Sequence, residues 1–183
     1  WLLLPTPYAV TATILLHLVI GGLGAYGVGR RLLRLGQMGA LLTAVSFTLG
    51  GYVTAQVEHV NQLQGMVWLP WFFVVAGRLE IGDWRLVGRQ AWWLAGLFAL
   101  QLLAGHTQTV FVTVVGLGVW LLTNLWHNYR GFVRVRPRLS VSYLLLPFIL
   151  GGVMALGLTA VQLLPTLELS QLSSRQGGLP VNE

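Results

Sequence analysis

Residues 90–129 read QAWWLAGLFALQLLAGHTQTVFVTVVGLGVWLLTNLWHNY and contain no Asp, Glu, Lys or Arg. A helix that crosses a membrane needs roughly 20 apolar residues, because each residue advances it by about 1.5 Å through a hydrocarbon layer about 30 Å thick. The stretch is therefore long enough for two membrane-spanning helices. Glycine and polar residues interrupt helices, so we place the break at residues 105–108.

The rest of the chain has the same apolar character. It has 183 residues, of which 55% are hydrophobic and 9% are charged, whereas soluble domains carry about 25% charged residues. There is no cysteine, which excludes disulfides and thiolate chemistry. Uncharged runs predict an all-α, polytopic transmembrane helix bundle with about six spans, near residues 8–29, 36–56, 65–79, 88–104, 109–127 and 140–164.

The positive charges support this division into spans. The net charge is +6, and all eleven basic residues are arginines. A nucleic-acid-binding protein would carry a basic stripe on a soluble fold, but here the arginines form short clusters after the first, third and fifth predicted spans. Cytoplasmic loops are rich in Lys and Arg, so these three loops are predicted to be cytoplasmic. Trp1 and the polar clusters described below then lie on the extracytoplasmic side.

We expect residues 1–183 to form a single transmembrane helical domain that belongs to a longer chain, because the sequence opens at Trp1 without an initiator methionine. Glycines within the first and last spans are predicted to let helices approach closely. Several tryptophans near predicted span ends, among them Trp68, Trp71, Trp92 and Trp93, are typical of an aromatic belt at the membrane surface.

Three polar clusters on the predicted exterior side carry the candidate functional residues. The first contains Glu58, His59 and Asn61; a carboxylate beside an imidazole suits proton transfer, although the segment also fits a solvated loop. The second is Gly105-His106-Thr107-Gln108, where free N–H groups at a helix start favour an anion; a polar turn is the alternative.

The third cluster follows the last span. Pro165 is predicted to end or kink that span. Glu168 and Arg175 lie seven residues apart and would share a face of a continuous helix. Arg175 is the one predicted exterior arginine, which makes it a candidate for phosphate or carboxylate recognition. A surface amphipathic segment is the alternative.

A histidine within the first span, His17, is predicted to make a hydrogen bond between helices. It is also the one histidine deep enough in a span to be an axial ligand of haem or chlorophyll.

The polar clusters, in their order, resemble those of YfhO-type bacterial membrane proteins. The matching pieces are Ser46-Phe47, Gly50-Gly51-Tyr52, His59 with Asn61, Trp68-Leu69-Pro70, Gly105-His106-x-Gln108, Gln162-Leu163-Leu164-Pro165-x-x-Glu168 and Ser174-Arg175. The resemblance covers nearly the whole chain, but members of that family are much longer.

The resemblance implies a fold similar to the GT-C glycosyltransferases and a multi-pass location in the bacterial cytoplasmic membrane. It implies transfer of a sugar from a polyprenyl-phosphate donor to a cell-envelope acceptor outside the cytoplasm. Glu58 and Glu168 are then the candidate catalytic carboxylates, with His59, Asn61, His106, Gln108 and Arg175 as candidate substrate contacts. In GT-C enzymes the main acidic residue lies in the first exterior loop, which here would precede Trp1.

The resemblance implies no particular cofactor; a divalent metal is compatible with it, but no residue pattern indicates one. The expected partners are the lipid bilayer, the polyprenyl-phosphate sugar and other membrane subunits, with no nucleic acid. A second interpretation is a non-catalytic subunit of a larger membrane complex, including one that contains pigment or haem. A transporter is less favoured, because no pair of broken spans around a midplane site is evident.

Overall fold

The protein is described by a computed structural model that covers residues 5–77, 84–129 and 141–172. Within these ranges all regular structure is helical, which confirms the predicted all-α class. The elements are α1 (Thr6–Gly27), a π-helix (Val28–Leu32), α2 (Gln37–Thr48), α3 (Gly51–Ala55), a 3₁₀-helix (Gln56–Glu58), α4 (Val60–Met66), α5 (Leu69–Ala76), α6 (Trp84–Leu103), α7 (Thr107–Tyr129) and α8 (Val141–Gln171).

Four helical segments among the described residues are long and apolar enough to cross a membrane. They are Tyr8–Leu32, Gln37–Glu58, Thr107–Trp126 and Leu145–Gln171. Large apolar side chains on them are exposed, for example Leu16, Leu42, Leu122 and Val153. Water would penalise so many exposed apolar side chains, whereas lipid tails accommodate them. The chain is therefore a multi-pass membrane protein.

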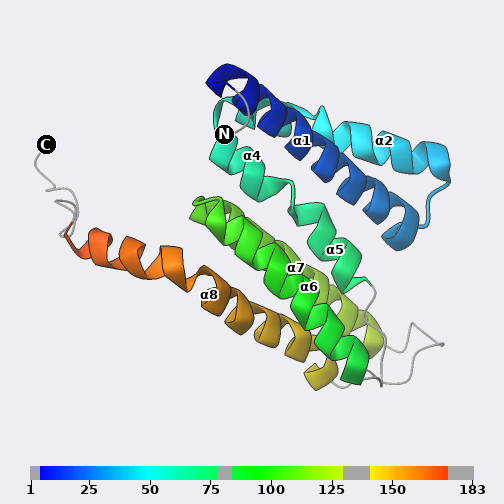
Figure 1. The fold of residues 1–183 in the computed structure, drawn as a ribbon. Coiled ribbons are helices and arrows are strands. Elements are labelled where there is room, and N and C mark those ends of the chain that lie inside the picture. The colour runs from blue at the N-terminus through cyan, green and yellow to red at the C-terminus, as the bar shows by residue number, and fades with distance from the viewer. Residues whose placement is uncertain (1–4, 78–83, 130–140, 173–183) are drawn as a thin grey trace, which may run out of the picture.

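Glycine contacts fix the direction of the first passes (Figure 1). Gly22 faces Thr48 and Gly29 faces Ala40. The partner number falls as the α1 number rises, so α1 and α2 are antiparallel. Against α5 and the residues just before it the order is reversed: Gly21 faces Val67, Gly24 faces Trp71 and Gly27 faces Val74. The third pass, α4 followed by α5, therefore runs parallel to α1.

The later passes continue this alternation. Gly65 lies against Thr109 and Gly116 lies against Phe73, so α7 runs parallel to α4 and α5. The short turn after α6 makes α6 antiparallel to α7. Gly151 of α8 packs on Leu94 of α6, and Figure 1 shows α8 beside α6 and running the same way. The described helices thus run in six alternating passes, but only four segments among them are long and apolar enough to cross a membrane, fewer than the about six spans that the sequence predicts.

Two of the six passes are not apolar spans in their own right. The third is split into α4 and α5 at Val67 and Trp68, where Pro70 lacks the N–H group that would bond the carbonyl of Met66. The fourth, α6, includes Arg85, Gln90 and Gln101. Each of these passes buries one face of its helices, as Phe72 and Leu94 do, and there the neighbouring helices supply contacts that lipid would not give.

The alternation gives the bundle two distinct ends. The turn end holds the α6–α7 turn, the 3₁₀-helix and the first turns of α1 and α4 (Figure 1). The arginine end holds the π-helix, the end of α5 and the beginning of α6, with Arg30, Arg31, Arg34, Arg85 and Arg89.

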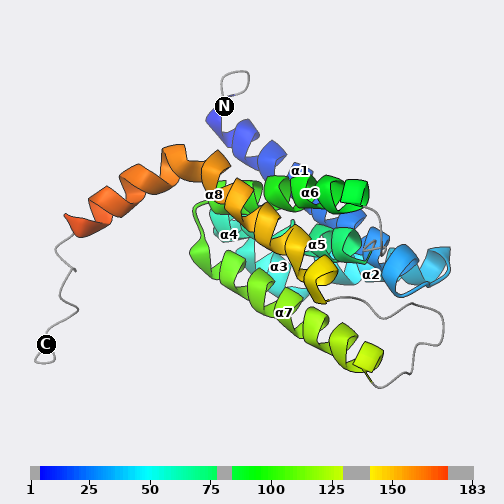
Figure 2. The same ribbon diagram turned by 90° about the horizontal axis from the view of Figure 1, so that it is seen from below.

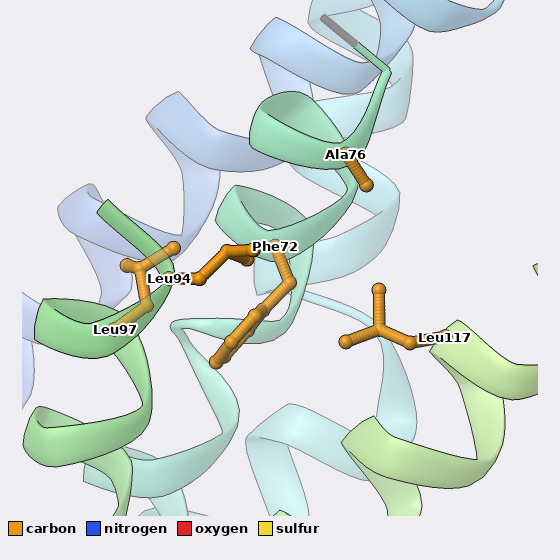
Figure 3. Packing of buried hydrophobic residues seen from close by; sticks show 5 residues of the cluster. All are labelled: Phe72, Ala76, Leu94, Leu97 and Leu117. Atoms are coloured by element: carbon orange, nitrogen blue, oxygen red, sulfur yellow. The ribbon is translucent and has the colours of Figure 1, made fainter. Parts of the chain in front are cut away.

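A hydrophobic cluster holds α5, α6 and α7 together (Figure 3). Phe72 is completely buried and lies between Leu94 and Leu97 of α6 on one side and Leu117 of α7 on the other. The Phe72 ring also contacts Phe98, with ring centroids 4.5 Å apart. Lipid is as apolar as these side chains, so close van der Waals contact rather than removal from water stabilises the cluster.

The aromatic belt stays a prediction for Trp92 and Trp93, which are exposed but lie at the middle of α6 rather than near one of its ends. Trp71 instead turns into the bundle, where its Nε1–H donates a hydrogen bond to the Ile20 carbonyl at 2.9 Å. Trp68 packs against the hydrophobic cluster. Trp71 can join α5 to α1 because Gly24 of α1 leaves room for its indole.

The last span is longer than predicted. Pro165 does not end it, because α8 continues to Gln171 with Pro147 and Pro165 inside it. Proline removes a helix hydrogen bond and crowds the preceding turn, which bends a helix. Figures 1 and 2 show α8 bending in its second half, so that its last turns project away from the other helices.

Not every glycine is a packing position. A Cβ at Gly29 would come within 2.8 Å of the Ala40 Cα, a backbone atom that cannot rotate away, whereas a Cβ at Gly152 meets nothing within 4 Å. We expect Gly29→Ala to lower the free energy of unfolding by about 1–3 kcal/mol through overpacking. Gly152→Ala, the control, should leave it unchanged or raise it by up to about 1 kcal/mol. Unfolding in mixed detergent followed by circular dichroism measures both, and equal effects would contradict this packing.

Candidate functional site

A cavity of about 220 Å³ lies at the turn end of the bundle. Residues from the second, third, fourth and fifth passes and from the α6–α7 turn line it: Tyr52, Met66, Leu69, Gln101, His106, Gln108, Thr109, Val112 and Thr113. Its walls are mainly apolar with a few polar atoms, which is the usual make-up of a small-molecule site.

The turn between α6 and α7 positions His106 at this cavity. Gly105 has a φ of +73°, a left-handed conformation that strains residues with a Cβ, and its N–H donates to the Leu102 carbonyl at 2.9 Å. The following residue, His106, precedes α7, and its carbonyl accepts a hydrogen bond from the Thr109 hydroxyl at 2.7 Å. The chain therefore reverses within three residues, 104–106, and leaves the His106 side chain in the cavity wall.

Gln101 joins three helices beside the cavity. It is completely buried, and its Nε2 donates hydrogen bonds to the Gly65 carbonyl at 2.9 Å and to the Thr113 hydroxyl at 2.8 Å. Gly65 lies near the end of α4, where carbonyl groups run short of donors within the helix. Gln101 supplies a donor at this break and so ties α4 to α6 and α7.

The orientation of the Gln101 amide follows from its partners. The Gly65 carbonyl only accepts hydrogen bonds, and the Thr113 hydroxyl gives its hydrogen to the Thr109 carbonyl at 2.9 Å. A flipped amide would set the Gln101 oxygen against both of these oxygens, so the nitrogen must lie here. The Gln101 Oε1 is left on the other side of the amide, and it has no hydrogen-bond partner.

Other buried polar atoms at the turn end also lack partners. They are His106 Nδ1, in the cavity wall, and Gln56 Oε1, in the 3₁₀-helix. Buried polar atoms are normally paired, and leaving one unpaired costs about 1–3 kcal/mol. Unpaired atoms gathered at one end of the bundle therefore indicate a place where water or a ligand binds.

The structure brings together only some of the predicted site residues. His106 and Gln108 both line the cavity. Glu58, His59 and Asn61 lie at the same end of the bundle, but they are exposed and do not line it. Glu168 is exposed on the last turns of α8, which project from the bundle (Figure 2). Arg175 lies outside the described residues.

The side chains that could bind a metal ion or a pigment do not come together among the described residues. The described residues hold no group of three His, Asp or Glu side chains that could bind a metal ion. His17 is half-buried on α1, and its Nδ1 lies 2.7 Å from the Thr13 carbonyl, so this nitrogen is the donor. This hydrogen bond lies within α1, whereas the sequence predicted one between two helices.

Gln101, Thr109 and Thr113 were not predicted as site residues. A signal was present, since a glutamine within an apolar helix is costly unless a polar partner faces it. Its partners could not be found, however, because Gly65 contributes a backbone carbonyl that has no signature in the sequence.

Comparison of the chain with protein-family models, curated proteins and solved structures found no match.

The Gln101 bonds make a prediction about stability. Gln101→Met keeps the side-chain volume but leaves the Gly65 carbonyl without this donor, so we expect the free energy of unfolding to fall by about 1–3 kcal/mol. Gln108→Met is the control, because Gln108 is exposed, and should change it by no more than about 0.5 kcal/mol. Unfolding in mixed detergent measures both variants. Matching curves for the two would show that these hydrogen bonds contribute no stability.

Proposed function

We propose that the turn end of the bundle faces the outside of a bacterial cytoplasmic membrane and that its cavity binds the polar head of a polyprenyl-phosphate sugar. The protein then takes part in transfer of that sugar to a cell-envelope acceptor. The observation that carries this proposal is the cavity with its unpaired buried polar atoms, placed at the same end as Glu58, His59 and Asn61.

The arginine distribution supports this orientation. The five described arginines are all at the arginine end, opposite the cavity. One of them, Arg30, donates from Nη1 to the Leu35 carbonyl at 2.8 Å and so helps to shape the loop before α2. Arginine-rich loops remain in the cytoplasm, which supports an outer position for the cavity.

The chemistry of an inverting transfer suits the groups at the turn end. The acceptor hydroxyl loses its proton to a carboxylate while its oxygen attacks the anomeric carbon of the sugar, and the bond from that carbon to the phosphate oxygen breaks. Among the described carboxylates Glu58 is the better candidate for the base, because it lies beside the cavity end of the bundle. Glu168 would first require the end of α8 to fold back.

A non-catalytic role in a larger membrane complex is the second candidate function. The observation that favours it is the projecting end of α8, whose large apolar side chains Leu164, Leu167, Leu169 and Leu172 are all exposed. Neighbouring helices of another subunit would cover such a segment as well as lipid does.

The orientation can be tested with single cysteines, because the chain has none of its own. We expect Gln108→Cys, at the turn end, to react with a membrane-impermeant maleimide in intact bacterial spheroplasts. Gly36→Cys, in the loop at the arginine end, should react only after the membrane is permeabilised. The reverse pattern would place the cavity in the cytoplasm and remove the proposed role outside the cell.

The transfer reaction can be tested in native membranes with a radiolabelled polyprenyl-phosphate glucose donor. We expect His106→Ala to lower the rate at least tenfold, because it removes a polar group from the cavity wall. Arg175→Ala should also lower it if this arginine contacts the donor phosphate. Glu58→Gln should lower the rate more than Glu168→Gln does, since Glu168 lies on the last turns of α8, which project away from the other helices.

The matched control for these variants is Thr159→Val. Thr159 is buried in α8, outside the cavity wall, and its hydroxyl bonds only within its own helix, to the Ala155 and Leu156 carbonyls. Transfer should be unchanged in this variant. Transfer that His106→Ala and Glu58→Gln both leave intact would rule out the proposed site.

A further inference from the structure

We infer that a groove between α1 and α2 binds an anionic phospholipid, with one acyl chain along the groove and the phosphate at the arginines beside its end. The groove shares no lining residue with the cavity at the turn end, and the inference does not depend on the proposed function. It rests on the shape of the groove, on its apolar lining and on the unbalanced charge at one end.

The groove is elongated along the two helices, which lie side by side in Figure 1. It has a volume of about 570 Å³, and its lining extends from Leu18 to Tyr26 on α1 and from Gln37 to Leu49, the residue after α2. The second stretch covers about three helical turns. Both helices belong to segments able to cross a membrane, so an acyl chain aligned with the helices can lie in the groove lengthwise.

The sequence explains why a groove forms here. Gly22 of α1 and Ala44 of α2 are small and half-buried, whereas Leu23 of α1 and Leu41 of α2 are large and exposed. The small residues leave a hollow between the helices, and the leucines stand on either side of it. The one hydroxyl toward the far end, that of Thr48, donates to the Ala44 carbonyl at 2.9 Å. A hydrocarbon chain can therefore make van der Waals contact along the groove without covering an unpaired polar group.

The end of the groove nearest the π-helix is polar. Tyr26 and Gln37 line this end. Arg30 follows Tyr26 by about one helical turn, and its Nη1 donates to the carbonyl of Leu35, two residues before Gln37. The Arg30 guanidinium is thus held beside the end of the groove. A guanidinium has five N–H donors, so the group that binds Leu35 keeps others for a phosphate.

The loop before α2 holds a second arginine in a strained backbone. The Leu35 N–H donates to the Gly29 carbonyl at 2.9 Å, so the loop folds back on the end of α1. Within this loop Arg34 has a φ of +54°, a conformation that glycine adopts readily but that is uncommon for a residue with a Cβ. An arginine here costs energy that glycine would not, and contact of its guanidinium with a phosphate would offset that cost.

The charge at this end is not balanced by the described residues. Arg30, Arg31 and Arg34 are all exposed. The described carboxylates are Glu58, at the turn end, and Glu168, on α8.

The sequence between α5 and α6 adds Glu80 and Asp83 together with Arg78, but the predicted arginine-rich loops as a whole hold ten arginines against these two acids. Basic clusters beside membrane helices attract anionic lipid heads. A zwitterionic head is a weaker partner because it brings a positive charge of its own.

The test uses a fluorophore beside the groove. Gly36→Cys carries a bimane label, which the loop tolerates because a Cβ at Gly36 meets nothing within 4 Å. The protein is placed in phosphatidylcholine nanodiscs that contain increasing amounts of phosphatidylglycerol or phosphatidylcholine with the same spin-labelled chain. We expect phosphatidylglycerol to quench half-maximally at a mole fraction about fivefold lower, as attraction to one or more arginines predicts. Bimane on Gln108→Cys, at the turn end, should show no such preference.

The role of the charge is tested by Arg30→Gln in the labelled protein. It keeps an amide donor but removes the charge, and we expect it to raise the half-quenching fraction of phosphatidylglycerol about threefold to fivefold. The matched control is Arg89→Gln, because Arg89 is an exposed arginine at the same end but lies on α6, outside the groove. This control should leave the half-quenching fraction unchanged.

The place of the acyl chain is tested by filling the groove. Ala44→Phe should weaken quenching by phosphatidylglycerol at least threefold. Val45→Phe adds a larger side chain at the next residue, which is exposed and does not line the groove, and it should have no effect. The comparison of the two lipids needs no change in the groove, so it stays decisive even where Ala44→Phe does not fold.

Four results would overturn the inference. Equal quenching by the two lipids would show that the head is not selected. An equal effect of Arg30→Gln and Arg89→Gln would show attraction to the whole arginine end rather than to a site. Equal effects of the two phenylalanine variants would place the chain outside the groove. No quenching by either lipid would show that protein, such as a second subunit, covers this face.

Discussion

The hydrogen bonds from Gln101 to the Gly65 carbonyl and the Thr113 hydroxyl lie where the backbone of the bundle is interrupted. Inside a membrane no water is at hand to satisfy a free carbonyl, so a broken helix persists only where the protein supplies the missing partner. The amide of α6 meets this need at the end of α4. The third pass can therefore bend between α4 and α5 without leaving that carbonyl unpaired.

Close helix contact is the second requirement, and glycine meets it on α1. Gly24 leaves room for the Trp71 indole, and the indole then reaches the Ile20 carbonyl. A larger residue at position 24 would push α5 away and break that bond. Packing on this side of the bundle and hydrogen bonding on the Gln101 side thus hold the broken pass from opposite directions.

The all-α class and the alternation of the passes could be predicted because they depend on properties that the sequence displays directly, namely apolar length, glycine breaks and arginine clusters. The end of α8 could not, because whether Pro165 bends or stops a helix depends on the packing around it. Trp71 was assigned to the membrane surface because its position near a break looks the same in sequence as a position at an interface.

The candidate site was predicted only at its rim. His106 and Gln108 were predicted because they belong to a polar turn beside Gly105. Gln101, four residues before Gly105, lies in an apolar helix, and its role depends on hydrogen bonds to Gly65 and Thr113, which are distant in the sequence. The relation between Glu58 and the cavity depends on where the 3₁₀-helix lies, between α3 and α4 at the turn end, and no spacing in the sequence encodes that placement. The catalytic and substrate-binding roles of these residues remain predictions.

One residue links the stability of the bundle to the character of its cavity. The Gln101 nitrogen is committed to Gly65 and Thr113, and this commitment is what directs the amide oxygen away from them. A change that released the Gly65 carbonyl would also free the amide to rotate, so the bend of the third pass and the fixed orientation of this amide depend on the same two hydrogen bonds.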